Sequence, residues 1–126
     1  MKFLISRDRF LDALDRIHSS VEKKSTVPIL GSLLFNVKGG EVSLFATDLE
    51  VGMRTSVQAI HRPGVVAEDG QIAIPAKTML DIVRELPAGS EILLTRTQNE
   101  WVELKCEEYR FNLLGFPAHA YLPESS

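Results

Sequence analysis

Cysteine is almost absent from the sequence, which has a single one, Cys106, among its 126 residues. One thiol cannot form a disulfide within the chain. The three histidines, His18, His61 and His119, lie far apart, and no group of cysteines and histidines has the spacing of a zinc site. We therefore expect a reducing, cytoplasmic compartment and neither a disulfide, a bound metal nor a cofactor.

Long apolar runs are also missing. No stretch approaches the roughly 18–20 uninterrupted apolar residues that a membrane-spanning helix needs. The short apolar run at residues 3–5 is followed at once by Arg7 and Asp8, without the apolar core or cleavage site of a signal peptide. The sequence predicts a soluble protein with no membrane partner.

Signals of catalysis are weak. The chain contains neither of the glycine-rich patterns that bind phosphate, G-x-x-x-x-G-K-[ST] and G-x-G-x-x-G. An enzymatic hypothesis would rest on Asp48 and Glu50, with His18 or His61 as a base. A solvated turn, in which Asp48 bonds to nearby backbone, explains the same residues more simply. We therefore expect a protein that is not an enzyme.

The charge balance gives no general reason to expect a nucleic-acid partner. Fourteen basic and 17 acidic residues give a net charge of −3. Residues 1–26 carry six basic and four acidic side chains, a balance of +2, and the remainder carries −5. This mild asymmetry would suit a body that tolerates DNA on one side only, but it does not identify one.

Apolar periodicity predicts two successive units with the same order of elements. A strand at 2–6 precedes an amphipathic helix at 7–21 with Ser6 as its N-cap, and strands follow at 31–37, 41–46 and 51–60. The pair Gly39-Gly40 predicts a tight hairpin between the first two of these strands. Residues 61–70 are polar and turn-rich, as in a connection between two halves.

The second unit repeats the pattern. A strand at 71–74 leads to a helix that begins near Pro75 and stops at Leu86-Pro87, and strands are expected at 91–97, 101–106 and 109–114. Residues 118–126 are expected to form a tail without a further element. We predict an α+β fold, a duplicated β-α-β-β-β domain with two helices packed on antiparallel sheets. The single domain would span 1–126, with halves at about 1–60 and 70–115.

Four strings resemble the amino-terminal domain of bacterial DNA sliding clamps, the beta subunit of DNA polymerase III. They are Met1-Lys2-Phe3, the segment TVPILGSL at 26–33, the segment TDLE at 47–50, and Ile74-Pro75-Ala76-Lys77 continuing to Leu86-Pro87. The resemblance extends along essentially the whole chain, whereas the family's chains have three such domains. It implies a non-catalytic processivity factor, in which two chains form a homodimeric ring around duplex DNA and tether the replicative polymerase. The polymerase and the clamp loader would bind mainly to the later domains.

The resemblance also implies a DNA-binding role for Lys24, which matches a position where clamps carry a basic residue that touches DNA. Lys23 is its neighbour. Arg9 and Arg16 lie on a polar flank of the first helix, next to Asp8, Asp12 and Asp15 on the adjoining outer face. Candidates on the outward face of the second helix are Lys77 and Arg84. For all of these, ordinary solvated charge remains the alternative.

The final strand suggests a contact with another chain. Tyr109, Phe111 and Leu113 alternate onto one face, which by itself indicates only a core-facing strand. By resemblance this strand is an edge, and Phe111 and Leu113 would pack against the third domain of a second subunit. Ile82, at the margin of the apolar stripe of the second helix, would join them, with a private core as the alternative. A different hypothesis is a protein-interaction module that uses the same β edge and never binds DNA.

Overall fold

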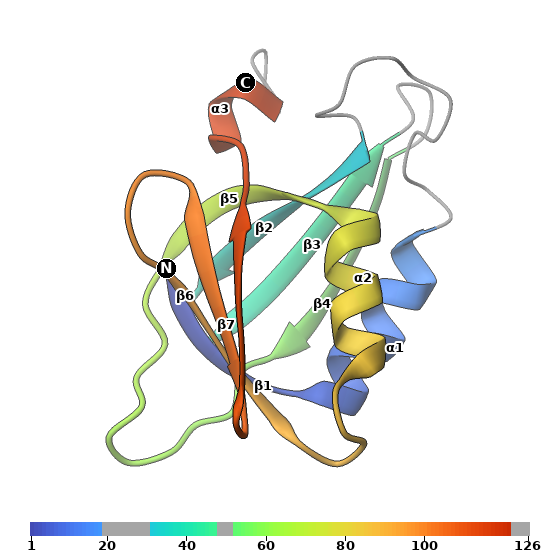
Figure 1. Ribbon diagram of the computed structural model, residues 1–126. Coiled ribbons are helices and arrows are strands. Elements are labelled where there is room, and N and C mark those ends of the chain that lie inside the picture. The colour runs from blue at the N-terminus through green and yellow to red at the C-terminus, as the bar shows by residue number, and fades with distance from the viewer. Residues whose placement is uncertain (19–30, 48–51, 122–126) are drawn as a thin grey trace.

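The computed structural model describes residues 1–18, 31–47 and 52–121 (Figure 1). Lys23, Lys24 and most of the two strings at 26–33 and 47–50 lie outside these residues. Among the helices of the described ranges, none is long and apolar enough to cross a membrane.

The elements follow the predicted order. They are β1 (Lys2–Ser6), α1 (Arg7–His18), β2 (Ser32–Lys38), β3 (Glu41–Thr47), β4 (Gly52–Gln58), β5 (Gly70–Pro75), α2 (Ala76–Glu85), β6 (Glu91–Arg96), β7 (Trp101–Cys106), β8 (Tyr109–Leu114) and α3 (Ala118–Tyr121). The fold class predicted from the sequence, two β-α-β-β-β units with two helices on antiparallel sheets, is confirmed.

The tail prediction needs a correction, because α3 forms a short helix where no element was expected. Its first turn closes with a hydrogen bond from the Ala120 N–H to the Pro117 carbonyl, at 3.0 Å. Proline suits such a start because its φ is already near the helical value. Four residues are too few to show a 3.6-residue period, so the pattern could not reveal this helix.

The two units exchange strands. One sheet has the order β1-β6-β7-β8 and the other β4-β3-β2-β5, and every pairing is antiparallel. The first strand of each unit therefore pairs in the sheet of the other unit, with Lys2 opposite Thr95 and Ser32 opposite Pro75. Neither unit completes a four-stranded sheet from its own residues.

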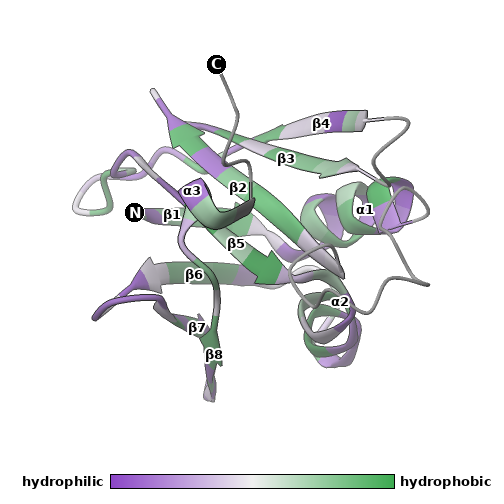
Figure 2. Ribbon diagram, turned by 90° about the horizontal axis from the view of Figure 1, so that it is seen from above, coloured by the Kyte–Doolittle hydropathy of each residue, from purple (hydrophilic) through white to green (hydrophobic). Residues whose placement is uncertain are grey.

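The main core lies between the two sheets and the two helices, and a separate, smaller cluster contains Leu34 and Ala73. Figure 2 shows the sheets on opposite sides of the view, with α1 and α2 together at one end. Phe10 of α1 is fully buried and meets Phe3 of β1 and Phe35 of β2 edge-on, with ring centroids 6.5 and 6.1 Å apart. Because Phe3 and Phe35 belong to different sheets, the Phe10 ring joins α1 to both.

Local signals in the sequence explain two of the connections. Ser6 caps α1, since its Oγ accepts a hydrogen bond from the Arg9 N–H at 3.3 Å. The hairpin between β2 and β3 turns at Gly39 and Gly40, whose φ angles are +58° and +84°. Glycine adopts this left-handed conformation without the steric cost that a Cβ would bring.

Each sheet has one covered edge. Beside β1, the Ile60 N–H donates to the Leu4 carbonyl at 2.7 Å and residue 68 pairs with residue 2. Beside β5, Phe116 exchanges two backbone hydrogen bonds with Ala73. Gly115 permits this approach, because a Cβ there would lie 2.5 Å from the Ala73 carbonyl oxygen. Within the described residues the outer edges of β8 and β4 carry no further strand.

Candidate functional surfaces

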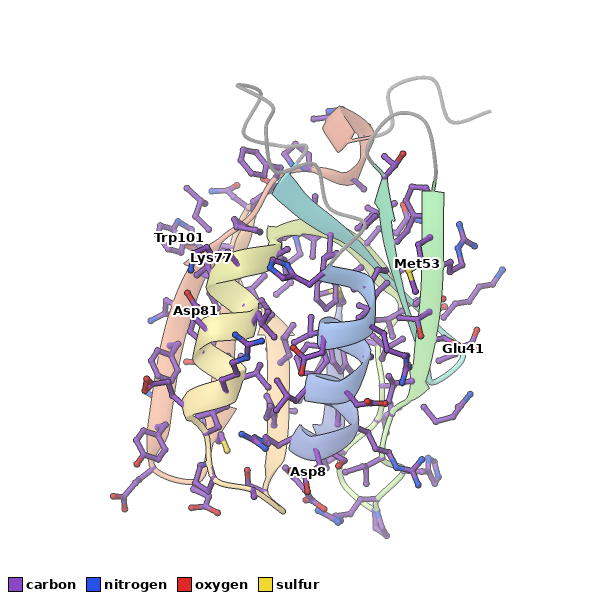
Figure 3. All side chains as sticks on the ribbon, turned by 90° about the vertical axis from the view of Figure 1, so that its right-hand side faces the viewer. Asp8, Glu41, Met53, Lys77, Asp81 and Trp101 are labelled. Atoms are coloured by element: carbon purple, nitrogen blue, oxygen red, sulfur yellow. The ribbon has the colours of Figure 1, made fainter. Side chains whose placement is uncertain are left out.

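The two long helices lie side by side and present charged side chains to solvent (Figure 3). We call this surface the helix face. It is defined by the exposed charged residues of α1 and α2: Asp8, Arg9, Asp12, Asp15, Arg16, Lys77, Asp81, Arg84 and Glu85. Four of the six basic residues proposed for DNA binding from the sequence, Arg9, Arg16, Lys77 and Arg84, are thereby brought onto one surface.

Three of these four cations form ion pairs with carboxylates of the same face. Arg16 pairs with Asp12 one turn away, and Lys77 Nζ lies 3.1 Å from Asp81 Oδ2. The third pair crosses between the helices, with Arg84 Nη2 at 2.9 Å from Asp15 Oδ1. All six side chains are 48–80% exposed, so solvent and other ligands can reach them.

Arg9 borders a groove between α1 and β4. The groove has a volume of about 410 Å³ and is lined by Arg9, Asp12, Arg16, Ser56, Val57 and Gln58. Arg16 also reaches β4, where its Nη2 donates to Thr55 Oγ1 at 3.0 Å. The groove thus combines two guanidinium groups with one carboxylate at the boundary between the helix face and the free edge of β4.

Arg7 has a structural role that sequence reasoning missed. Its side chain is only 13% exposed, and its guanidinium donates to the Val83 and Arg84 carbonyls, at 3.2 and 3.0 Å. These carbonyls lie in the last turn of α2, where backbone acceptors lack the usual i+4 donor, and the Val83 oxygen also accepts from the Leu86 N–H at 3.2 Å. Contacts across more than 70 residues leave no sequence periodicity, so no signal marked Arg7 as different from Arg9.

Asp8 joins the start of α1 to the turn after α2. Both of its carboxylate oxygens accept from the Gly89 N–H at 3.2 Å, and Arg7 Nη1 donates to Oδ1. The hydrogen bond from Gly89 is the main cause of a lowered pKa for Asp8, and Arg7 adds to it. Arg7 and Asp8 therefore link the start of α1 to the end of α2, and their hydrogen bonds hold the two helices of the helix face together.

The second surface lies between α2 and β8. A groove of about 390 Å³, which we call the edge groove, is lined by Asp81, Ile82, Glu85, Leu86, Tyr109 and Phe111. Ile82 and Phe111 are partly buried and pack against the core, while Tyr109 is 47% exposed. The carboxylates of Asp81 and Glu85 line the groove beside these apolar side chains.

The three residues expected at the subunit contact therefore differ in position. Phe111 and Ile82 line the edge groove, but Leu113 is 5% exposed and belongs to the core of the domain. Tyr109 and Glu85 were not proposed from the sequence. Tyr109 was assigned only to the apolar face of its strand, and the position of α2 opposite that strand could not be known from the pattern.

Together, the duplicated fold, the two helices on one side and the two open strand edges define a domain of the DNA-clamp type. The family model described as "DNA polymerase III beta subunit, N-terminal domain" matches residues 1–123, and the chain belongs to this family. The beta sliding clamp of Escherichia coli K12 is 35% identical over 120 residues, which cover 94% of this chain and 31% of the relative. That of Caulobacter vibrioides NA1000 is 36% identical over 121 residues, with the same coverage.

Solved structures agree with this assignment. A sliding clamp from Bartonella birtlesii, bound to griselimycin, superimposes with a TM-score of 0.88 at 34% identity, covering 100% of this chain and 32% of that one. The DNA polymerase sliding clamp from Caulobacter crescentus gives a TM-score of 0.87 at 34% identity, covering 100% and 33%. The chain thus spans about a third of the length of the relatives it matches.

Proposed function

We propose that residues 1–126 form the first of three clamp domains in a ring-forming, non-catalytic subunit that encircles duplex DNA and tethers the replicative polymerase. Family membership supports this proposal, as does a chain that covers 31–33% of its relatives. The observation that carries it is that, among the residues the structure describes, each sheet has one open strand edge, β8 in one and β4 in the other. An open edge is a ready surface for pairing with another strand.

Two open edges suit an internal link of a ring, because such a link needs one neighbour on each side. The edge of β8 would meet a second clamp subunit, with Phe111 and Ile82 in the contact and Leu113 supporting it from the core. The edge of β4 would then meet the next domain of the same chain. Backbone pairing along both edges would join successive domains without any bound cofactor.

The helix face would point into the ring, toward DNA. Its proposed DNA contacts are Arg9, Arg16, Lys77 and Arg84, to which Lys23 and Lys24 are added by resemblance. Phosphate contacts carry no base sequence, so binding through them is independent of sequence. The polymerase and the clamp loader would bind mainly to domains outside this chain, in the cytoplasm.

A retention experiment tests the ring directly. The longest native polypeptide that contains this sequence is loaded onto nicked circular DNA by its cellular loader, and the circle is then cut. We expect retention on the circle and loss after linearisation, because a ring slides off a free end. Unchanged retention on linear DNA would instead indicate ordinary direct binding. Retention on neither form, with the loader shown to be active, would favour the interaction module that uses the β8 edge alone.

Charge neutralisation tests the DNA-facing residues. Changing Lys24, Arg9 and Arg16 together to Gln should weaken salt-sensitive association with duplex DNA, since each lost phosphate contact reduces the slope of log K against log salt by about 0.9. Binding to a second subunit should stay the same, because neither Arg9 nor Arg16 lines the edge groove. Unaltered DNA association would refute these assignments.

A further inference from the structure

The charges of the helix face are arranged as pairs, although a surface built to grip DNA would leave its cations available. Asp12, Asp15 and Asp81 each hold one of the cations proposed to contact DNA. We propose that these carboxylates limit the contacts with DNA phosphates, so that the face attracts the duplex without holding it. This inference rests on the proposed function and names the residues that set the strength of the DNA contact.

The geometry makes each carboxylate a competitor of phosphate. Asp15 Oδ1 and Asp81 Oδ2 lie 2.9 and 3.1 Å from the nitrogen atoms of Arg84 and Lys77, which is the distance at which a phosphate oxygen would bind. A phosphate must therefore displace the carboxylate or share the cation with it. In the shared case the carboxylate repels the phosphate, and fewer phosphates are neutralised.

The exposure of the pairs makes this competition reversible. Asp12 is 68% exposed, Asp81 55% and Asp15 48%. Ion pairs in such positions are weak and open readily, so the cations remain available for brief contacts. A sliding surface needs this combination, because every firm phosphate contact would have to break at each step along the duplex.

Asp8 differs from these three carboxylates. It accepts hydrogen bonds from the Gly89 backbone and belongs to the contacts that hold the two helices. Asp81 also lines the edge groove, where a change could affect contact with another subunit. Asp12 and Asp15 are therefore the informative positions, since neither lines the edge groove. Asp12 lines the groove beside β4, so Asp15→Asn is also measured alone.

The test is the rate at which loaded rings leave DNA after linearisation, measured at 50 and 200 mM salt. The variant Asp12→Asn/Asp15→Asn keeps the side-chain shape and removes the carboxylates that pair with Arg16 and Arg84. Each gained phosphate contact changes binding by about 3.5-fold between these salt concentrations, so two contacts give up to about 12-fold. We expect the variant to leave linearised DNA more slowly than the unaltered ring at 50 mM salt, and at nearly the same rate as the unaltered ring at 200 mM.

The control variant Glu41→Gln/Glu68→Gln changes the net charge by the same amount at exposed residues outside the helices. It should leave DNA at the unaltered rate. In a second comparison, Arg84→Gln added to Asp15→Asn should remove the slowing that Asp15→Asn alone causes, because the freed cation is then missing. Melting temperatures of all variants establish that each one is folded.

The outcomes separate the two proposals. If the unaltered ring leaves on linearisation and Asp12→Asn/Asp15→Asn leaves at the rate of the charge-matched control, the inference is wrong and the ring proposal stands. If the unaltered protein stays on linear DNA, both are wrong. Slower, salt-sensitive release of the helix-face variant alone supports the inference.

Discussion

Phe10 is the side chain through which α1 packs against both sheets, so its removal should be among the most damaging changes in the chain. The ring is 0% exposed and meets Phe3 and Phe35 edge-on. Truncation of a buried phenylalanine to alanine costs about 3–5 kcal/mol through lost burial and the remaining cavity. Two aromatic contacts, each adding about 0.5–1.5 kcal/mol, place Phe10→Ala toward the upper end of that range.

Urea unfolding followed by circular dichroism measures this effect. With a slope of about 2 kcal/mol per molar urea, the midpoint for Phe10→Ala should fall by roughly 1.5–2.5 M. The milder Phe10→Leu fills most of the space and loses only the ring contacts, so its cost should be roughly 1–2 kcal/mol. The difference in the free energy of unfolding between the two variants measures the cost of the cavity that alanine leaves.

A small effect would refute the packing argument. If Phe10→Ala costs less than about 1 kcal/mol, or no more than Phe10→Leu, the ring is not enclosed by both sheets. Should Phe10→Ala fail to fold, a double-mutant cycle of Phe10→Leu with Phe35→Leu still measures the contact. We expect a coupling of about 0.5–1.5 kcal/mol between these two rings.

Two further predictions concern backbone and pH. Gly115→Ala places a Cβ 2.5 Å from the Ala73 carbonyl oxygen, so we expect a loss of roughly 1–3 kcal/mol in thermal unfolding; an unchanged melting temperature would contradict the close approach. The pKa of Asp8 is lowered from 3.8 chiefly by the Gly89 N–H, so its stabilising effect is complete above that pH and is lost as pH falls through the lower, folded value. The difference in melting temperature between the unaltered chain and Asp8→Asn should therefore shrink below about pH 3.8, and a constant difference would refute the linkage.

The helices and strands could be predicted because their buried residues are apolar and recur at regular spacings along the sequence. In β1, Phe3 and Ile5 point into the core between partly exposed neighbours, and Ser6 marks the start of α1. Strand partners could not be predicted in the same way. The alternation of β1 fixes which side chains are buried but does not indicate that Lys2 lies opposite Thr95.

The functional surfaces could also be predicted only in part. Helical spacing placed Arg16 and Arg84 on exposed positions, and both are exposed. The charge partner of Arg16 is Asp12, one turn away on the same helix, but the partner of Arg84 required the fold, since Asp15 lies 69 residues away. The strand alternation likewise grouped Phe111 with Leu113, but only the packing of α2 against β8 distinguishes a residue that lines the edge groove from one within the core.

The exchange of strands between the two units has a consequence for synthesis on the ribosome. β1 emerges first, but its partner β6 follows about 90 residues later, which at roughly 5–20 residues per second is a delay of about 5–20 s. Throughout that interval Phe3 and Ile5 lack the sheet that buries them. The sheet β4-β3-β2-β5 has all its strands once Pro75 is made, whereas the sheet that begins with β1 has all its strands only after Leu114.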